Sequence, residues 1–362
     1  MIYNTCVKSN SKSKTRKKNT PRIRLSPVVR VLAELRAARS MSSDDDAFRV
    51  QGLLAQTIDR IDAGINQPNL DTLEKYARAL NLTIALRSDE SSTTLKLALP
   101  KQRVFAVYNH AGGVGKTSLT RDLGYAISQV GYRVLLIDLD PQSNLTSWLG
   151  VARPVDIERT VYPTILGEQR EPELPVPFRV HGMDIIPATI RLNRIDRSSI
   201  QGRRRRLQKA LINSNYDVVL IDMNPSITNL TEIGLAAANG LIVPTPTSEK
   251  GLDAFPGILE SLEEARDELN PDLAITMFVL TQYNGNTAID QEMYKQIEEY
   301  ASAIAPVVGP LSSSVIYREA ITTGKPIALY DPSHQAVEQI SRVATLLLDL
   351  MHRGEQGDQN AQ

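Results

Sequence analysis

The segment that most constrains the fold is VYNHAGGVGKTS, residues 107–118, because it places a glycine-rich turn between an apolar run and a helical pattern. VFAVY before the turn has the composition of a buried strand, and SLTRDLGYAISQV after it is typical of a helix. Strand, glycine-rich turn and helix in this order are the context of a phosphate-binding loop. The general pattern G-x-x-x-x-G-K-[ST] is matched at Gly115, Lys116 and Thr117, but its first glycine is replaced here by His110.

The residue types in the turn suit phosphate chemistry despite that mismatch. Glycines let backbone N–H groups converge on phosphate oxygens without Cβ clashes, and the helix N-terminus adds partial positive charge. Lys116 is able to reach the β- and γ-phosphates of a nucleotide, and the Thr117 hydroxyl is able to bind Mg²⁺. The alternative is a glycine-rich turn without a chemical role, which this context disfavours. The residues expected to bind ATP are Gly112, Gly113, Val114, Gly115, Lys116, Thr117 and Ser118.

From residue 103 onward, short apolar runs alternate with helical stretches. The runs are residues 103–108, 133–140, 216–224, 240–245 and 274–280. This alternation predicts an α/β domain with a mostly parallel sheet and helices on both faces. Two runs end in acids, Asp138 with Asp140 and then Asp222, so these carboxylates are expected near the phosphates at the carboxyl ends of the strands. Asp222 would hold Mg²⁺ through water, and an acid near the γ-phosphate would orient the attacking water.

Several segments in order resemble the ParA/MinD family of deviant Walker ATPases, and specifically its ParA partition proteins. GGVGKTS is similar to the family's phosphate loop, RVLLIDLDPQSNLT to its second motif and YDVVLIDMNPSITNLT to its Walker B segment. IVPTPTSEKGLDA and REAITTGKPIALYDP follow in the family's order and spacing. Asn224 stands where the family commonly has proline or another small residue. The likeness covers about residues 103–350 and implies a P-loop NTPase fold.

The resemblance implies a role for each matching residue. Lys116 and Asp138 would be catalytic, with Asp138 positioning the hydrolytic water, and Thr117 and Asp222 would be the metal-binding residues. ATP or ADP and Mg²⁺ are the expected cofactors. The resemblance also implies ATP-dependent sandwich homodimers that bind DNA without sequence preference. A centromere-binding ParB-type partner would stimulate a slow ATPase.

One residue departs from the family pattern. The family's signature lysine opens the motif at the position that Ala111 occupies here, and in the family it reaches across the dimer to the partner's phosphates. The loop itself keeps Lys116 and its glycines, so ATP binding is still expected. The departure puts the cross-dimer contact in question, and Lys250 and Arg121 are the two cations considered as substitutes.

Residues 28–82 resemble a helix-turn-helix domain of the Cro and phage-repressor type. Gly52 would sit in the turn and Leu54–Ala63 would be the recognition helix. The alternative is a small helical bundle used for dimerisation or for contact with ParB. Alternation in residues 83–88 and 93–99 predicts a β-hairpin around a DESS turn. The residues expected to reach base edges are Gln56, Thr57, Asp59 and Arg60.

These features predict four parts of the chain: a basic disordered arm at 1–27, the helix-turn-helix unit with its hairpin at 28–100, the ATPase domain at 101–353 and a polar tail at 354–362.

The chain has 41 basic and 41 acidic residues, but its first 40 residues hold eleven Lys or Arg and one acid. The arm is therefore a candidate nucleic-acid contact, or else a solvated leader without a target. The arm has no apolar core of the kind that secretory signals carry, and one cysteine excludes a disulfide within the chain, so a cytoplasmic protein is expected.

Other basic residues are candidates for DNA contact in the ATPase domain. Arg318 and Lys325 are similar to family positions near the DNA-binding surface of the dimer, and Arg342 is a weaker candidate. Arg203–Arg206 would contact DNA phosphates or form a solvated helix surface paired with acids. No membrane attachment is expected, because the segment after residue 354 lacks apolar residues other than alanine.

The sequence therefore predicts an ATP-dependent plasmid or chromosome partition protein of the bacterial cytoplasm and nucleoid. Its helix-turn-helix would add operator binding and autorepression. The alternative is a nucleotide-sensing transcriptional repressor with weak or no ATP hydrolysis, in which Ala111 marks the loss of turnover.

Overall fold

The computed structural model describes residues 2–5, 83–89, 92–98, 102–200, 202–212, 214–226, 228–285 and 287–360. The chain divides into two compact units, residues 1–101 and 102–362. The expected helix-turn-helix, with Gln56, Thr57, Asp59 and Arg60, lies outside the described residues, and so does the basic stretch Lys8–Arg24.

The first unit contains a small antiparallel sheet of β1 (Ile2–Thr5), β2 (Thr83–Asp89) and β3 (Ser92–Ala98), in the order β1-β3-β2. β2 and β3 pair from Thr83 opposite Ala98 to Asp89 opposite Ser92, which confirms the predicted hairpin. β1 pairs antiparallel with β3, a partnership that the sequence pattern did not indicate.

The second unit is built on one sheet with the strand order β11-β10-β9-β4-β8-β5-β7-β6. Every pairing in it is parallel except that of β6 with β7. The strands are β4 (Arg103–Val107), β5 (Val134–Asp138), β6 (Phe178–Val180), β7 (Met183–Ile186), β8 (Val218–Asp222), β9 (Gly240–Pro246), β10 (Ala274–Thr281) and β11 (Val307–Val308). All five strands expected from the apolar runs are confirmed, and the mostly parallel sheet is confirmed with them.

Alternate side chains of the central strands enter two separate cores. In β4, Val104 belongs to the first core and Phe105 to the second; in β5, Ile137 belongs to the first and Leu136 to the second. Because successive side chains of a strand point to opposite faces, both faces of the sheet are covered. The continuous apolar runs in the sequence follow from this double burial, and the expected helices on both faces are confirmed.

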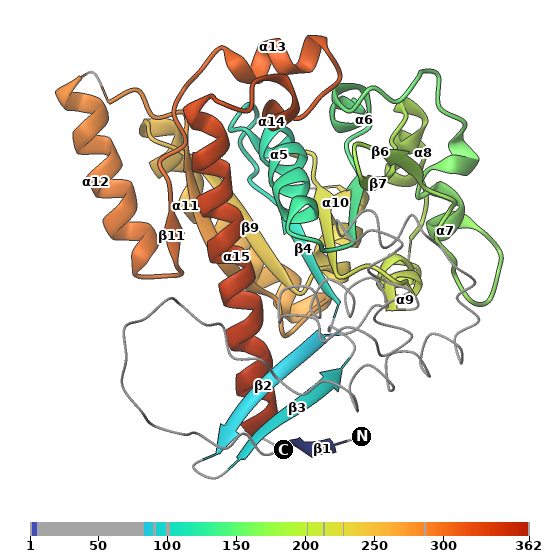
Figure 1. The fold of residues 1–362 in the computed structure, drawn as a ribbon. Helices are drawn as coiled ribbons and strands as arrows, with labels where there is room; N and C mark the ends of the chain where they lie inside the picture. The colour runs from blue at the N-terminus through green and yellow to red at the C-terminus, as the bar shows by residue number, and fades with distance from the viewer. Residues whose placement is uncertain are drawn as a thin grey trace. The chain divides into compact units, whose positions relative to one another are not determined.

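The helices divide between the two faces (Figure 1). The helices that contribute to the second core are α5 (Lys116–Gln129), α6 (Asn144–Trp148), α13 (Ile316–Thr322), α14 (Ile327–Tyr330) and α15 (Gln335–Asn360). Those that contribute to the first are α7 (Tyr162–Leu166), α8 (Asn193–Asp196), α9 (Arg206–Ile212), α10 (Asn229–Ala237), α11 (Glu249–Glu268) and α12 (Ala288–Ser302). Short 3₁₀ turns lie at Ile157–Arg159 and Ile190–Leu192. Among the described residues, no helix is long and apolar enough to cross a membrane.

Three features differ from the sequence expectations. β6 and β7 form an antiparallel hairpin that the apolar pattern did not predict; its turn is His181–Gly182, both with positive φ (48° and 85°), the combination of a type I′ hairpin turn. β11 is two residues long, too short for a periodic signal. The last helix, α15, continues to Asn360, into the segment expected to be a polar tail.

We expect Gly124→Val to destabilise the protein, because α5 packs against the sheet at Gly124 without room for a larger side chain. A Cβ there would lie 2.7 Å from Leu136 Cδ2 and 3.3 Å from Met183 Sδ. Overpacking a core of this kind costs about 1–3 kcal/mol of unfolding free energy, measurable by urea denaturation. The control is Ala126→Val, which places the same side chain on α5 beside a pocket instead. Equal losses in the two variants would contradict the close helix–sheet approach.

Candidate nucleotide-binding site

The turn between β4 and α5 needs its glycines for backbone conformation. Gly113 and Gly115 have φ of +73° and +96°, in the left-handed region that side chains with a Cβ disfavour. A Cβ at Gly112 would meet nothing within 4 Å, so that glycine faces open space. The loop therefore leaves room for a ligand to approach its backbone.

Side chains from the end of β10 and the start of α11 hold the carbonyl groups of the turn. The Thr281 hydroxyl, at the end of β10, donates to the Val114 carbonyl at 2.9 Å. The Gln282 amide donates to the Gly113 carbonyl at 2.5 Å, and the Lys250 ammonium donates to the Gly112 carbonyl. Three successive carbonyls are thus bound by donors from α11, from the last residue of β10 and from the residue that follows it.

The start of the turn is held in the same way by residues of the loop itself. The Lys116 ammonium donates to the carbonyls of Asn109 at 2.7 Å and Ala111 at 3.0 Å. The Asn109 side chain accepts from the Ala111 N–H at 2.8 Å and donates to the Pro244 carbonyl at 2.9 Å, which ties the loop to β9. These bonds fix the loop without any ligand.

The N–H groups of the turn remain available. Within the described residues, none of the N–H groups of 112–118 has a protein acceptor, while the next one, that of Leu119, donates to the Gly115 carbonyl at 2.9 Å. Successive free N–H groups at a helix N-terminus form an anion-binding nest. The structure thus brings together the seven residues predicted to bind phosphate.

The two unusual residues of the loop are accommodated by packing. The His110 ring lies against α11, where a Cβ on Gly257 would be only 2.8 Å from His110 Cε1. Ala111 packs against the first core. Neither residue disturbs the nest, so the missing first glycine of the general pattern leaves the loop intact.

Two buried carboxyl groups lie side by side at the ends of neighbouring strands. Asp138 of β5 is opposite Asp222 of β8 in the parallel register, and both side chains are fully buried. Asp138 accepts from the Thr146 N–H at 2.9 Å, the Thr146 hydroxyl at 2.7 Å and the Asp140 N–H at 3.1 Å. Burial, partly offset by the bonds from Thr146, raises the pKa of Asp138 to about 7.

Asp222 is less well satisfied than Asp138. Its Oδ1 accepts a long bond of 3.4 Å from the Thr120 hydroxyl, while its buried Oδ2 has no protein partner. Burial first and the neighbouring Asp138 second raise the pKa of Asp222 well above its ordinary value, and the Thr117 side chain lowers it. An unpartnered buried carboxylate oxygen beside a threonine hydroxyl fits a divalent cation that binds oxygen ligands.

The protein groups at this point are too few to bind a metal ion by themselves. Among the described residues, no three His, Cys, Asp or Glu side chains cluster as a metal site. Mg²⁺ commonly takes one or two protein oxygens and completes its shell with phosphate and water. The arrangement therefore suits a cation that enters with a phosphate ligand.

The surroundings of Lys116 lower the pKa of its ammonium group. Burial lowers its pKa to about 8, Asp222 and Asp140 act in the opposite direction, and the positive charge of Lys250 lowers it further. Loss of solvent therefore outweighs the nearby acids in the ligand-free site. A phosphate group entering the nest would restore the preference of Lys116 for its charged form.

The structure separates the two cations considered as substitutes at Ala111. Arg121 is fully buried in α5, where its Nε and Nη2 donate to Asp122 at 2.9 and 2.8 Å. This placement excludes Arg121 as a phosphate contact. Lys250 of α11 is exposed, and its ammonium contacts the loop at the Gly112 carbonyl.

The candidate DNA residues fall into two groups. Arg318 on α13 and Lys325 just before α14 are exposed and, within the described residues, have no carboxylate partner. Arg203–Arg206 are held by the protein instead: three of them donate to backbone carbonyls of Leu166, Leu269, Thr164 and Gln169, and Arg204 pairs with Glu232 at 2.7 Å. The arginine run therefore joins α9 to its neighbours, which favours its structural interpretation.

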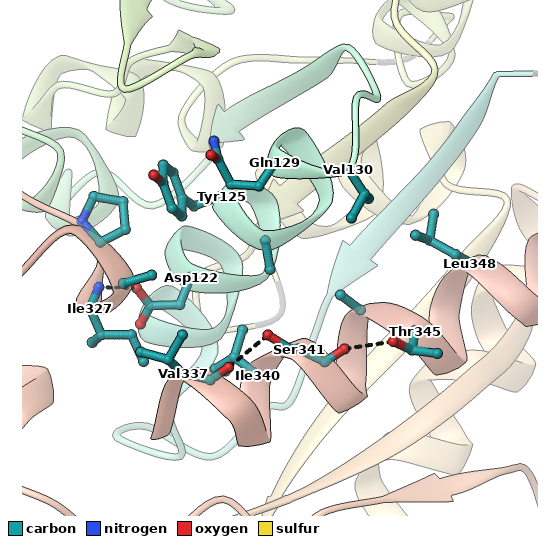
Figure 2. Close-up of a pocket in the computed structure, with 14 residues that line it drawn as sticks. Asp122, Tyr125, Gln129, Val130, Ile327, Val337, Ile340, Ser341, Thr345 and Leu348 are labelled. Carbon is teal, nitrogen blue, oxygen red and sulfur yellow. Dashed lines mark hydrogen bonds between the residues drawn. The ribbon is translucent and has the colours of Figure 1, made fainter. Parts of the chain in front are cut away.

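A pocket of about 280 Å³ lies away from the loop, between α5, α14 and α15 (Figure 2). Its lining is mainly apolar, with Val337, Ile340 and Leu348 contributed by α15. Asp122 lies at its edge and accepts from the Ile327 N–H at 2.9 Å, a bond that joins α5 to α14. The phosphate loop and the two buried acids lie outside this pocket.

Sequence reasoning missed the residues that support the site from a distance. Thr146 holds Asp138, and Thr281 with Gln282 holds the loop. Thr281 and Gln282 follow the apolar run of β10 directly, so the rule that ligands bind at the carboxyl ends of parallel strands was a usable signal for them. Thr146 offered no comparable signal, because its contact with Asp138 depends on how α6 folds back over β5.

Comparisons with known proteins agree with this geometry. A family model described as an AAA domain matches residues 102–275. The chain is 36% identical over 257 residues to a probable plasmid-partitioning protein ParA of Thermus thermophilus, covering 67% of this chain and 77% of that relative. It is 33% identical over 241 residues to the sporulation initiation inhibitor protein Soj of Bacillus subtilis, and the match covers 65% of this chain and 94% of that relative. Cobyrinic acid a,c-diamide synthase of Mycobacterium smegmatis, solved with ADP and magnesium, has a TM-score of 0.58 at 28% identity and covers 70% of this chain and 97% of that one.

We expect Asp222→Asn to stabilise the ligand-free protein, because the change removes one of two adjacent buried carboxylates and gives the unpartnered oxygen position an uncharged group. The folded pKa of Asp222 is raised above its ordinary value of 3.8, so the stability that its protonated form confers is present at low pH and is lost as pH rises from about 4 to the folded pKa. The gain in unfolding free energy relative to the parent should be absent below about pH 4 and reach roughly 1–2 kcal/mol near pH 8.

Thermal unfolding of both proteins across this pH range measures the effect. Asp217→Asn is the matched control, since Asp217 is a buried acid that immediately precedes the same strand but pairs with Arg133 at 3.0 Å. A variant that is less stable than the parent at every pH would contradict the charge argument.

Proposed function

Because the chain belongs to the ParA/MinD family of P-loop ATPases, we propose that it is an ATP-dependent DNA partition protein that hydrolyses ATP to ADP and phosphate. The observation that carries the proposal is the anion nest of residues 112–118 next to the buried pair Asp138 and Asp222. The relative named as a probable plasmid-partitioning protein ParA favours partition over the alternative of a nucleotide-sensing repressor without turnover.

The chain's own residues would perform distinct tasks in hydrolysis. The free N–H groups of the loop bind the phosphate oxygens, and Lys116 exchanges its two loop carbonyls for phosphate contacts. Asp138, held in place by Thr146, would orient the attacking water in line with the γ-phosphate. A carboxyl group with a pKa of about 7 is suited to accept a proton at neutral pH.

Mg²⁺ is the metal that this site fits. The solved structure from Mycobacterium smegmatis contains ADP and magnesium, and its fold extends over most of the second unit. Thr117 and the Oδ2 atom of Asp222 are the protein groups that would hold the cation, directly or through water. The bound cation would neutralise charge on the phosphates.

We propose the remaining parts of the partition cycle on the same family basis. ATP would drive a sandwich homodimer that binds nucleoid DNA without sequence preference through Arg318 and Lys325. A ParB-type centromere-binding protein would stimulate hydrolysis and release. The segment with Gln56, Thr57, Asp59 and Arg60 would bind an operator, so the protein would also repress transcription. We propose that it is a cytoplasmic, nucleoid-associated protein.

We expect ATP turnover to rise when nonspecific DNA and the ParB-type partner are added together. Lys116→Ala should abolish nucleotide binding, because it removes the buried ammonium of the loop. Asp138→Ala should keep nucleotide binding and lower turnover about 100-fold or more, because it removes the group that orients water. Phosphate release and nucleotide binding are measured on the same preparations. Tight nucleotide binding without stimulated turnover would leave the repressor as the better description.

We expect Arg318→Ala and Lys325→Ala to weaken nonspecific DNA binding in the presence of ATP, since each removes an exposed cation. Each loss should reduce the slope of log K against log salt by about 1, the value for one phosphate contact. Fluorescence anisotropy with a random duplex measures the slope. Lys209→Ala on α9 is the control, because it removes an exposed lysine from another part of the domain. Unchanged slopes in the two test variants would place the DNA surface elsewhere.

A further inference from the structure

The phosphate loop has one cation of its own, and a second cation reaches it from another element. Lys116 is buried and bound to the carbonyls of Asn109 and Ala111, and the opening position of the loop is the apolar Ala111. Lys250, the second residue of α11, places its ammonium on the Gly112 carbonyl. The lysine nearest the mouth of the nest is therefore supplied by the β9–α11 junction.

The backbone at that junction is fixed, so the position of Lys250 is determined by the fold. Thr247 N–H donates to the Thr281 carbonyl at 3.0 Å, and Gly251 N–H donates to the Ser248 carbonyl at 2.7 Å. A Cβ at Gly251 would lie 2.0 Å from the Pro246 carbonyl oxygen, so only glycine lets α11 begin this close to the end of β9. Lys250 is thereby held at the carboxyl edge of the sheet.

If Lys250 only held the Gly112 carbonyl in place, its positive charge would not be required. The neighbouring carbonyl of Gly113 is held by the neutral amide of Gln282, and that of Val114 by the hydroxyl of Thr281. The ammonium of Lys250 is exposed, has no carboxylate partner within the described residues, and disfavours the charged form of nearby Lys116. A second positive charge is unfavourable in the empty nest and becomes favourable once a polyanion enters.

We propose that Lys250 is a phosphate-contacting residue of the nucleotide site, contributed by the same chain, which exchanges the Gly112 carbonyl for an oxygen of the ATP phosphate chain. A lysine has three donors on a flexible four-carbon stem, so this exchange needs only side-chain rotation. The inference rests on the proposed ATPase function. It makes the cation set of the site complete within one chain, so that this phosphate contact does not depend on a partner copy.

The test compares three variants of the full chain in binding of a non-hydrolysable ATP analogue and of ADP, measured by isothermal titration calorimetry. Lys250→Gln retains a donor for the Gly112 carbonyl but removes the charge. It should weaken binding of the ATP analogue about tenfold, the usual size of one charge-assisted hydrogen bond. Lys250→Arg should stay within about threefold of the parent because it keeps the charge. Lys295→Gln, an exposed lysine on α12, should leave affinity unchanged.

Two further measurements separate the phosphate contact from a purely structural clasp and from a contact across a dimer. The ratio of parent to Lys250→Gln affinity should fall as salt is raised, since a partly exposed ion contact is screened. The same ratio should be independent of protein concentration if Lys250 acts within its own chain.

Each contrary result has a distinct meaning. Parent-like affinity of Lys250→Gln would overturn the inference and leave Lys250 as a clasp of the loop, with the proposed ATPase intact. A defect that appears only at high protein concentration would overturn the contact within one chain. Absence of nucleotide binding in the parent, equal to that of Lys116→Ala, would overturn the proposed function and the inference with it.

Discussion

The nucleotide site depends on how the carbonyl groups of one loop are held. A short glycine-rich turn has as many acceptors as donors, and it binds an anion only if its carbonyls face away from the ligand. Here Lys116, Lys250, Gln282 and Thr281 together bind the carbonyls of residues 109 and 111–114. The N–H groups are left to point into the nest. The two helices and the strand end that supply these donors, α5, α11 and the end of β10, must therefore be in place before the loop acquires its function.

This dependence explains which parts of the site were predictable from sequence. Lys116, Thr117 and the glycines are local, because strand, turn and helix follow one another in the chain. Asp138 and Asp222 were predictable because continuous apolar runs indicate buried parallel strands, whose carboxyl ends share one edge of the sheet. The parallel register then places the two acids opposite each other, as the structure confirms.

Other features could not be predicted. They depend on contacts between segments that are far apart in the sequence, or on the burial of a side chain that is usually exposed. Gln282 and Gly113 are 169 positions apart, and no periodicity links them. Arg121 would ordinarily be placed on the solvent side of α5, but it is buried by pairing with its neighbour Asp122, and Asp122 in turn binds the start of α14. The β6–β7 hairpin escaped notice because its strands are three and four residues long and β6 is only partly buried.

The hydrogen bond between Asp122 and Ile327 connects the nucleotide site to the surface segment that carries Lys325. α5 begins at the phosphate loop, and its Asp122 is joined by a buried hydrogen bond of 2.9 Å to the residue that starts α14. Lys325 lies two positions before that residue, and its N–H is bonded back to Ala320 of α13 at 3.3 Å, the helix that carries Arg318. One buried contact therefore connects the helix that begins at the phosphate loop with the segment that carries both cations. Two like-charge conflicts lie beside the N-terminal end of α5. Lys116 is near Lys250 of α11, and Asp138 of β5 is near Asp222 of β8, which also contacts Thr120. A polyanion relieves the first conflict and a divalent cation relieves the second, so a nucleotide that binds together with a metal ion resolves both at once.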